Sequence, residues 1–260
     1  MKKSKILAFV ISIMLAVSCF VGCGDDKVSN SNEKKDSTSQ TTIKEENTDD
    51  GDSGSNQTNN DVNECITFGK YEQDNNEENG KEDIEWLVLE RKEGKAFVVS
   101  KYALDCKQYN DEYVDVTWET CTLRAWLNNA FINDAFTPDE KTLISTVTVT
   151  NNDNAEFKID GGNDTQDKVF LLSIDEINNY FDSKEERMCG ATDYAKAQSA
   201  WTDDYYTAEG KDTCWWWLRS PGEYQCNASS VSSSGGFYLE GYVVDRDNRA
   251  VRPAMWISIE

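Results

Sequence analysis

The chain has 260 residues and a strongly acidic composition, with 48 Asp and Glu against 26 Lys and Arg and a net charge of −22. A surface this acidic disfavours nucleic acid and anionic lipid headgroups as partners. The chain also contains no histidine, which excludes the commonest general base and every Ser–His or Cys–His nucleophile pair.

The N-terminal residues indicate export and a lipid anchor. Basic residues precede an apolar run at residues 6–18, which is shorter than the roughly 20 residues of a membrane-spanning helix. Cys23 follows Gly22 shortly after this run, and the arrangement resembles the lipobox of bacterial lipoproteins. The resemblance implies that residues 1–22 are a signal peptide and that a lipid on Cys23 holds the protein at the extracytoplasmic face of the cell membrane. Lipid on Cys19 and cleavage without lipid are the alternatives.

A linker is expected to follow the anchor. Residues 23–63 are acidic and polar and contain no aromatic residue, so they cannot bury enough apolar surface to offset the entropy of ordering. We therefore predict a disordered linker over this range. All eight tryptophans lie later, between Trp86 and Trp256, and residues 64–260 are predicted to form one globular domain.

Three strands are predicted at the start of this domain. Residues 66–71, 84–89 and 96–100 are rich in β-branched and aromatic residues, and residues 91–95, with Gly94, form a turn between the second and third. These strands predict the first part of a sheet.

Helices are predicted in the middle of the domain. Residues 120–131 place apolar side chains at helical spacing, and Thr137 and Ser173 each begin a capping box. Residues 192–199 are predicted as a further helix, and residues 169–172 as a short buried strand.

The last third of the chain is aromatic and rich in Ser and Gly, without helical periodicity. Strands are predicted at residues 215–220, 237–245 and 252–259, with turns at residues 221–222 and 235–236. Early strands, central helices and late strands together predict an α+β fold.

Several segments resemble an uncharacterised bacterial domain family of unknown function. They are FGKY (68–71), IEWLVL (84–89), LRAWLN (123–128), DKVFLLS (167–173), WLRSPG (217–222) and VRPAMWI (251–257). That family is in turn similar to the formylglycine-generating-enzyme and C-type-lectin-like group. The resemblance implies a single C-type-lectin-like domain with a mixed sheet, in which the chain ends share one sheet and ligands bind the irregular surface near the end of the chain.

The ligand-contact residues are predicted in the late aromatic and Ser-rich segment, whose composition is typical of adaptable binding loops. The predicted residues are Trp215, Trp217, Ser229, Ser232, Ser233, Tyr238, Tyr242, Asp245, Arg246 and Asn248. The alternatives are core packing for the tryptophans and an ordinary surface loop for the others. Arg219 and Arg252 are predicted to pair with buried carboxylates.

Cysteines and carboxylates suggest two further features. Six cysteines follow Cys23, and an exported domain can form disulfides. Cys214 with Cys226 is the favoured pair, and Cys106 with Cys121 is the second. Zinc is disfavoured because the chain lacks histidine and a CxxC motif.

Calcium is the one metal that the sequence suggests. Asp160, Asp164 and Asp167 offer hard oxygen ligands on one glycine-containing loop. The alternative is that these carboxylates serve turns and caps. No other cofactor is expected.

These features favour a module that binds a glycan, a peptide or a protein outside the cell. One alternative is a histidine-free enzyme that uses carboxylates or cysteines, like a glycoside hydrolase or a formylglycine-generating oxidase. The other is a structural envelope protein without a specific ligand. Two close carboxylates or two unbridged cysteines in a cleft would favour an enzyme, whereas an exposed aromatic face would favour binding.

Overall fold

The computed structural model of the protein describes residues 64–259. The predicted signal peptide, the predicted lipid attachment at Cys23 and the predicted linker at residues 23–63 lie outside the described residues. No helix between residues 64 and 259 is long and apolar enough to span a bilayer.

The first of two five-stranded sheets contains strands from both ends of the domain, in the order β1-β2-β3-β14-β7. Its strands are β1 (Cys65–Tyr71), β2 (Glu82–Lys92), β3 (Lys95–Ser100), β7 (Val169–Phe170) and β14 (Ala254–Ser258). The turn between β2 and β3 holds Glu93 and Gly94 at φ of 52° and 72°, as a two-residue hairpin requires. The three early strands, the turn and the late strand are confirmed.

β14 joins this sheet by pairing antiparallel with β3 on one side and with β7 on the other. The first and last strands therefore share one sheet, as predicted, but β2 and β3 separate them.

The second sheet has the order β12-β11-β10-β13-β4, with β10 and β13 parallel and the other pairs antiparallel. Its strands are β4 (Asp105–Cys106), β10 (Trp216–Pro221), β11 (Asn227–Val231), β12 (Phe237–Val243) and β13 (Ala250–Val251). Two separate pairs are β5 (Val147–Val149) with β6 (Thr165–Asp167), and β8 (Thr202–Ala208) with β9 (Lys211–Cys214).

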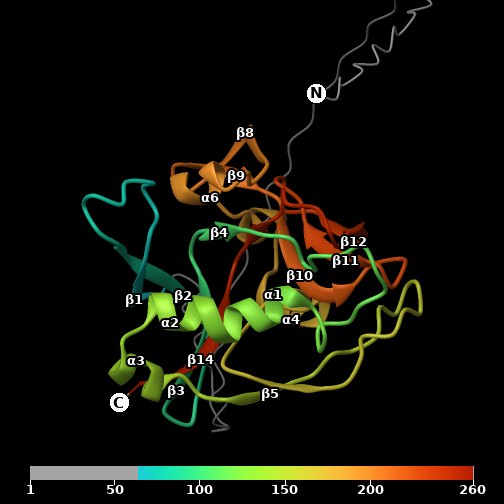
Figure 1. Cartoon of the computed structure of the whole chain (residues 1–260), viewed down its shortest axis with the longest axis horizontal. Helices are drawn as coiled ribbons and strands as arrows, with labels where there is room; N and C mark the ends of the chain where they lie inside the picture. Colours follow the sequence, from blue (N-terminus) through green and yellow to red (C-terminus); the bar gives the residue numbers. More distant parts are fainter. Residues whose placement is uncertain (1–63, 260) are drawn as a thin grey trace, which may run out of the picture. The chain divides into compact units, whose positions relative to one another are not determined.

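The predicted helix at residues 120–131 is divided into three pieces, which Figure 1 shows as one continuous ribbon across the domain. They are α1 (Thr122–Trp126), the π-helical η1 (Leu127–Phe131) and α2 (Ile132–Ala135). The other helices are α3 (Pro138–Leu143), α4 (Ile174–Tyr180), α5 (Lys184–Arg187) and α6 (Asp193–Ala197). Thr137 and Ser173 form the predicted capping boxes of α3 and α4, and Thr192 caps α6.

The core lies between the sheets and the helices, and its largest fully buried side chains include Trp86, Trp118, Trp216 and Trp217. An antiparallel sheet, a mixed sheet and short helices make the described residues an α+β fold. The C-type-lectin-like assignment stays a prediction.

One buried ion pair joins α4 to β10. The guanidinium of Arg219 contacts the carboxylate of Glu176 and donates hydrogen bonds to the carbonyl oxygens of Leu171 (2.7 Å) and Thr150 (2.9 Å). The predicted carboxylate partner of Arg219 is thereby confirmed.

Arg252 differs from this prediction. It is buried, but its Nε donates to the Ser100 carbonyl at 3.0 Å, and its guanidinium lies over the rings of Phe181 and Trp216. No carboxylate pairs with it among the described residues. Its prediction is wrong because aromatic faces and a carbonyl take the place of the expected anion.

Candidate ligand-binding surface

Side chains from four chain segments meet beside the edge strand β12. The segments precede β8, join β9 to β10, form β12, and join β12 to β13. We call this group the aromatic–arginine surface, and it consists of Trp201, Trp215, Tyr238, Tyr242, Asn248 and Arg249.

Backbone hydrogen bonds hold three of these segments together. The N–H of Trp201 donates to the Asn248 carbonyl at 3.1 Å, and the N–H of Trp215 donates to the Trp201 carbonyl at 3.4 Å. The Trp215 carbonyl in turn accepts a hydrogen bond of 2.8 Å from Ala250 at the start of β13. The positions of both indole rings are therefore set by main-chain pairing.

The aromatic rings contact one another edge to face. Trp215 lies 6.4 Å from Trp201 at 70°, and 5.5 Å from Tyr238 at 84°, measured between ring centroids and planes. This geometry is favoured between aromatic rings and contributes about 0.5–1.5 kcal/mol per pair beyond the buried area. The rings thus hold one another in fixed orientations.

Arg249 lies among these rings. Its guanidinium carbon is 4.7 Å from the ring centroid of Trp215 and 4.2 Å from that of Tyr242. The residue is only 7% exposed, and Nη1 donates to the Asn248 side-chain oxygen at 3.0 Å. Desolvation lowers the pKa of Arg249 from its ordinary value.

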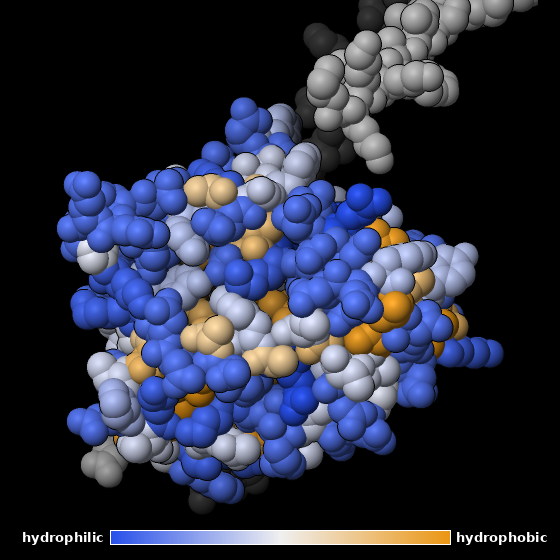
Figure 2. All heavy atoms as spheres, in the orientation of Figure 1, coloured by the Kyte–Doolittle hydropathy of each residue, from blue (hydrophilic) through white to orange (hydrophobic). Residues whose placement is uncertain are grey.

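Trp201 gives the surface its outward-facing part. It is 47% exposed, and it is the one tryptophan between residues 64 and 259 that ranks among the exposed large apolar residues. Figure 2 shows that the face in view is mostly hydrophilic, with apolar residues in small patches. The exposed indole of Trp201, in contact with the ring of Trp215, therefore gives this surface an aromatic face that is open to solvent.

The residues of the aromatic–arginine surface lie within a part of the chain that matches a known domain family. A family model described as "Domain of unknown function (DUF6273)" matches residues 93–259. The chain belongs to this family. The expected membership of an uncharacterised domain family is thus confirmed, and the DUF6273 match contains the whole aromatic–arginine surface. Searches of the curated proteins and of the solved structures gave no match.

Four of the predicted contact residues come together in the DUF6273 domain: Trp215, Tyr238, Tyr242 and Asn248. Asp245 and Arg246 lie in the turn after β12, half-buried and exposed respectively. Sequence reasoning missed Trp201 and Arg249. The only signal for Arg249 was its place two residues before the VRPAMWI segment, and nothing in the sequence showed that backbone pairing brings Trp201 there.

Two of the predicted contact residues are in the core instead. Trp217 is fully buried, with its indole N–H donating to the Lys107 carbonyl at 2.9 Å. Ser229 is also fully buried, and its hydroxyl donates to the Pro221 carbonyl at 2.7 Å. Both predictions are wrong because β10 and β11 are interior strands of the second sheet.

The remaining two predicted serines, Ser232 and Ser233, lie in the turn between β11 and β12 and form hydrogen bonds there. Ser232 accepts a hydrogen bond from the Gly236 N–H at 3.0 Å, and the buried Ser233 donates to Asp203 at 3.4 Å.

The predicted disulfide between Cys214 and Cys226 is wrong, and so is the pair Cys106 with Cys121, because all six cysteines of the described residues are free. Cys214 is buried, and its N–H donates to the Cys189 carbonyl at 2.9 Å. Cys226 lies instead beside the hydroxyl of Tyr113. Cys121 caps α1, since its sulfur accepts the Arg124 N–H.

These environments predict two classes of thiol. In the native full-length chain, iodoacetamide should alkylate Cys65, which is exposed, and Cys226, which is half-buried. The buried Cys106 and Cys121 should react only after unfolding, since burial raises the pKa of each to about 12 and the thiolate is the reactive form. Peptide mass spectrometry, with and without denaturant, measures which cysteines are alkylated in the native and in the unfolded chain. Rapid native labelling of Cys121 would contradict the described packing.

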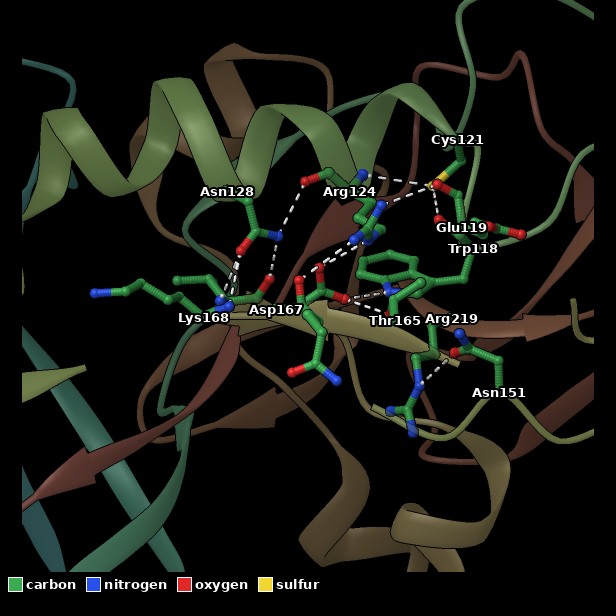
Figure 3. Close-up of polar contacts among 12 residues, drawn as sticks. Trp118, Glu119, Cys121, Arg124, Asn128, Asn151, Thr165, Asp167, Lys168 and Arg219 are labelled. Atoms are coloured by element: carbon green, nitrogen blue, oxygen red, sulfur yellow. Dashed lines mark hydrogen bonds and ion pairs between the residues drawn. The ribbon is translucent and has the colours of Figure 1, made fainter. Parts of the chain in front are cut away.

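The three carboxylates of the predicted calcium site have separate roles. Figure 3 shows the Asp167 carboxylate accepting hydrogen bonds from Trp118 (3.0 Å), Thr165 (2.6 Å) and Arg124 (2.7 Å). Asp160 accepts the Gly162 N–H, and Asp164 accepts the Asn151 N–H. Asp160 therefore serves a turn, as in the alternative, whereas Asp164 and Asp167 bond to other segments of the chain. The calcium prediction gains no support.

A different carboxylate group lies in the β1–β2 connection. Oxygens of Glu72, Asp74 and Glu82 are within 4.8 Å of one another. They accept backbone N–H groups of Gln73 and Asn76, so they stabilise the loop itself.

A groove with a volume of about 580 Å³ lies between β1 and the α2–α3 segment. Its charged side chains already have partners: Lys70 pairs with Asp83 at 2.5 Å, and Glu140 closes the capping box of α3. The aromatic–arginine surface is the stronger candidate, because its guanidinium still has unused donors.

Proposed function

We propose that the protein is a lipid-anchored module outside the cytoplasm that binds a glycan, a peptide or a protein through the aromatic–arginine surface. The observation that carries this proposal is the contact of Trp215 with Trp201, Tyr238 and Arg249 beside an edge strand. The predicted anchor at Cys23 would hold the domain at the membrane, and the linker would separate the two.

The composition of the surface supports binding. Tryptophan, tyrosine and arginine are the residues most enriched where binding energy concentrates. Tryptophan and tyrosine offer large contact areas with few rotatable bonds. The edge-to-face contacts fix the rings before a ligand arrives, so less side-chain entropy is lost on association. The flat face of an exposed indole such as Trp201 suits stacking on a sugar ring or an apolar side chain.

The chemistry of the surface also favours binding over catalysis. Its polar groups are the amide of Asn248 and the guanidinium of Arg249, which orient a ligand by hydrogen bonds. The cysteine pair expected of an oxidase is divided between the buried Cys214 and the separate Cys226.

Substitution of the two tryptophans tests this proposal. The full-length chain in detergent is screened on glycan and peptide arrays, and Trp201→Ala and Trp215→Ala should each weaken binding about tenfold or more because a stacking surface is removed. Tyr224→Ala is the matched control, since Tyr224 is 60% exposed and lies in the β10–β11 turn. Equal affinities for all three variants and the unmodified chain would contradict the proposal.

A further inference from the structure

Arg249 is a buried cation without a counter-ion. It is 7% exposed, and no carboxylate of the described residues forms an ion pair with it. Arg124 and Arg219 pair with Asp167 and Glu176, whereas the buried Arg252 and the half-buried Arg187 also have no carboxylate partner among the described residues. Arg249 differs from these two because it lies between the half-buried rings of Trp215 and Tyr242 in the aromatic–arginine surface. A buried charge without a partner is costly, so such a group is ready to accept an anion.

The unused donors of Arg249 are on one edge of the guanidinium. Nη1 is engaged by the side-chain oxygen of Asn248. Nε is buried and has no hydrogen-bond partner, and Nη2 donates no hydrogen bond to any described residue. Nε and Nη2 point to the same side of a guanidinium, and together they form the edge that binds a carboxylate with two parallel hydrogen bonds.

Building on the proposed function, we infer that the ligand of the aromatic–arginine surface carries a carboxylate that binds the Nε–Nη2 edge of Arg249. The carboxylate supplies the missing negative charge and accepts both unused N–H groups. The rest of the ligand packs on Trp215 and Trp201. A neutral carbonyl would satisfy one donor and leave the charge unpaired.

Access to this edge requires a small rearrangement. Nε is closed off from solvent, and the ring of Tyr242 lies against the guanidinium at 4.2 Å. Tyr242 is half-buried on β12, which is the edge strand of its sheet. Rotation of the Tyr242 side chain would expose the Nε–Nη2 edge of Arg249 to a ligand. The hydrogen bond between Nη1 and Asn248 would remain.

Two sources of a carboxylate are distinguished by matched probes. One arm uses a short oligogalacturonate and its methyl ester, and the other uses a hexapeptide with a free C-terminal carboxylate and the same peptide as an amide. In one of the two arms, calorimetry with the full-length chain should show that the acid probe binds at least about tenfold tighter than its neutral counterpart. Equal affinity for acid and neutral partner overturns the inference, as does stronger competition by inorganic phosphate than by the acid.

Variants separate this inference from the proposed function. Arg249→Gln should lose the preference for the acid, whereas Arg246→Gln should keep it, because Arg246 is an exposed arginine three residues away. If Trp215→Ala still abolishes binding but acid and neutral probes bind alike, the surface is correct and the carboxylate is wrong. If Trp215→Ala binds like the unmodified chain, the proposed function itself fails.

Thermal unfolding gives a second readout. The acid probe should raise the unfolding temperature of the unmodified chain and leave that of Arg249→Gln unchanged. Equal shifts for the two chains, or no shift for either, overturn the inference.

Discussion

Replacement of Glu176 by alanine is expected to lower the free energy of unfolding by about 3–5 kcal/mol, because it leaves Arg219 buried without its anion. Arg219 has 3% of its side chain exposed and Glu176 has 24%, so the guanidinium cannot recover hydration when the carboxylate is removed. The same carboxylate closes the capping box of α4 by accepting the Ser173 N–H at 2.9 Å. One substitution therefore removes a charge partner and a helix cap together.

Glu140 provides the matched control for this experiment. It occupies the same position in the capping box of α3, where its carboxylate accepts the Thr137 N–H at 2.8 Å, and no buried arginine pairs with it in the described part of the chain. Glu140→Ala should cost about 1 kcal/mol, the usual size of a cap contribution. Urea unfolding of both variants measures the difference, and equal losses would show that the ion pair adds nothing to the cap.

Trp217→Ala is expected to cost about 3–5 kcal/mol of stability, because it removes a fully buried indole from the second sheet. The ring packs edge to face against Tyr109 at 5.8 Å, and its N–H is the donor to the Lys107 carbonyl. The substitution therefore leaves both a cavity and an unsatisfied carbonyl.

Trp215→Ala should behave differently although it lies two residues away. Its ring is half-buried and contacts other surface rings, so its removal should cost about 1 kcal/mol of stability while abolishing ligand binding. Denaturant unfolding and array binding, measured on both variants, separate the two roles. Similar losses of stability for Trp215 and Trp217 would contradict the division between surface and core.

The sequence predicted those elements whose signals are local. The capping boxes at Thr137 and Ser173 are complete within four residues, and the Gly94 turn follows from the conformation that glycine allows. The strands β8 and β11 were missed for different reasons. β11, with the sequence NASSV, contains few of the residues that favour strands, whereas β8, with the sequence TDDYYTA, contains Thr and Tyr but also two adjacent Asp residues and no alternation of apolar and polar residues. Their formation depends on pairing with neighbouring strands, which no single segment encodes.

The candidate site shows the same limit. A strand at residues 215–220, as predicted, would place Trp215 and Trp217 on one face because side chains alternate along a strand. β10 begins at Trp216, so Trp215 precedes the strand and the alternation does not apply to it. Within β10 both faces are covered, and Trp216 and Trp217 are both buried. The role of each tryptophan was therefore decided by where the strand begins and by what covers it.

The position of β14 has a consequence for the order in which the domain acquires its structure. Residues 254–258 are inserted between β3 and β7, so the first sheet stays incomplete until these residues have been synthesised. Before that moment β3 exposes a row of unpaired backbone groups, and pairing across so long a sequence separation closes slowly. A nascent chain of this topology therefore cannot complete its first sheet until residues 254–258 have left the ribosome.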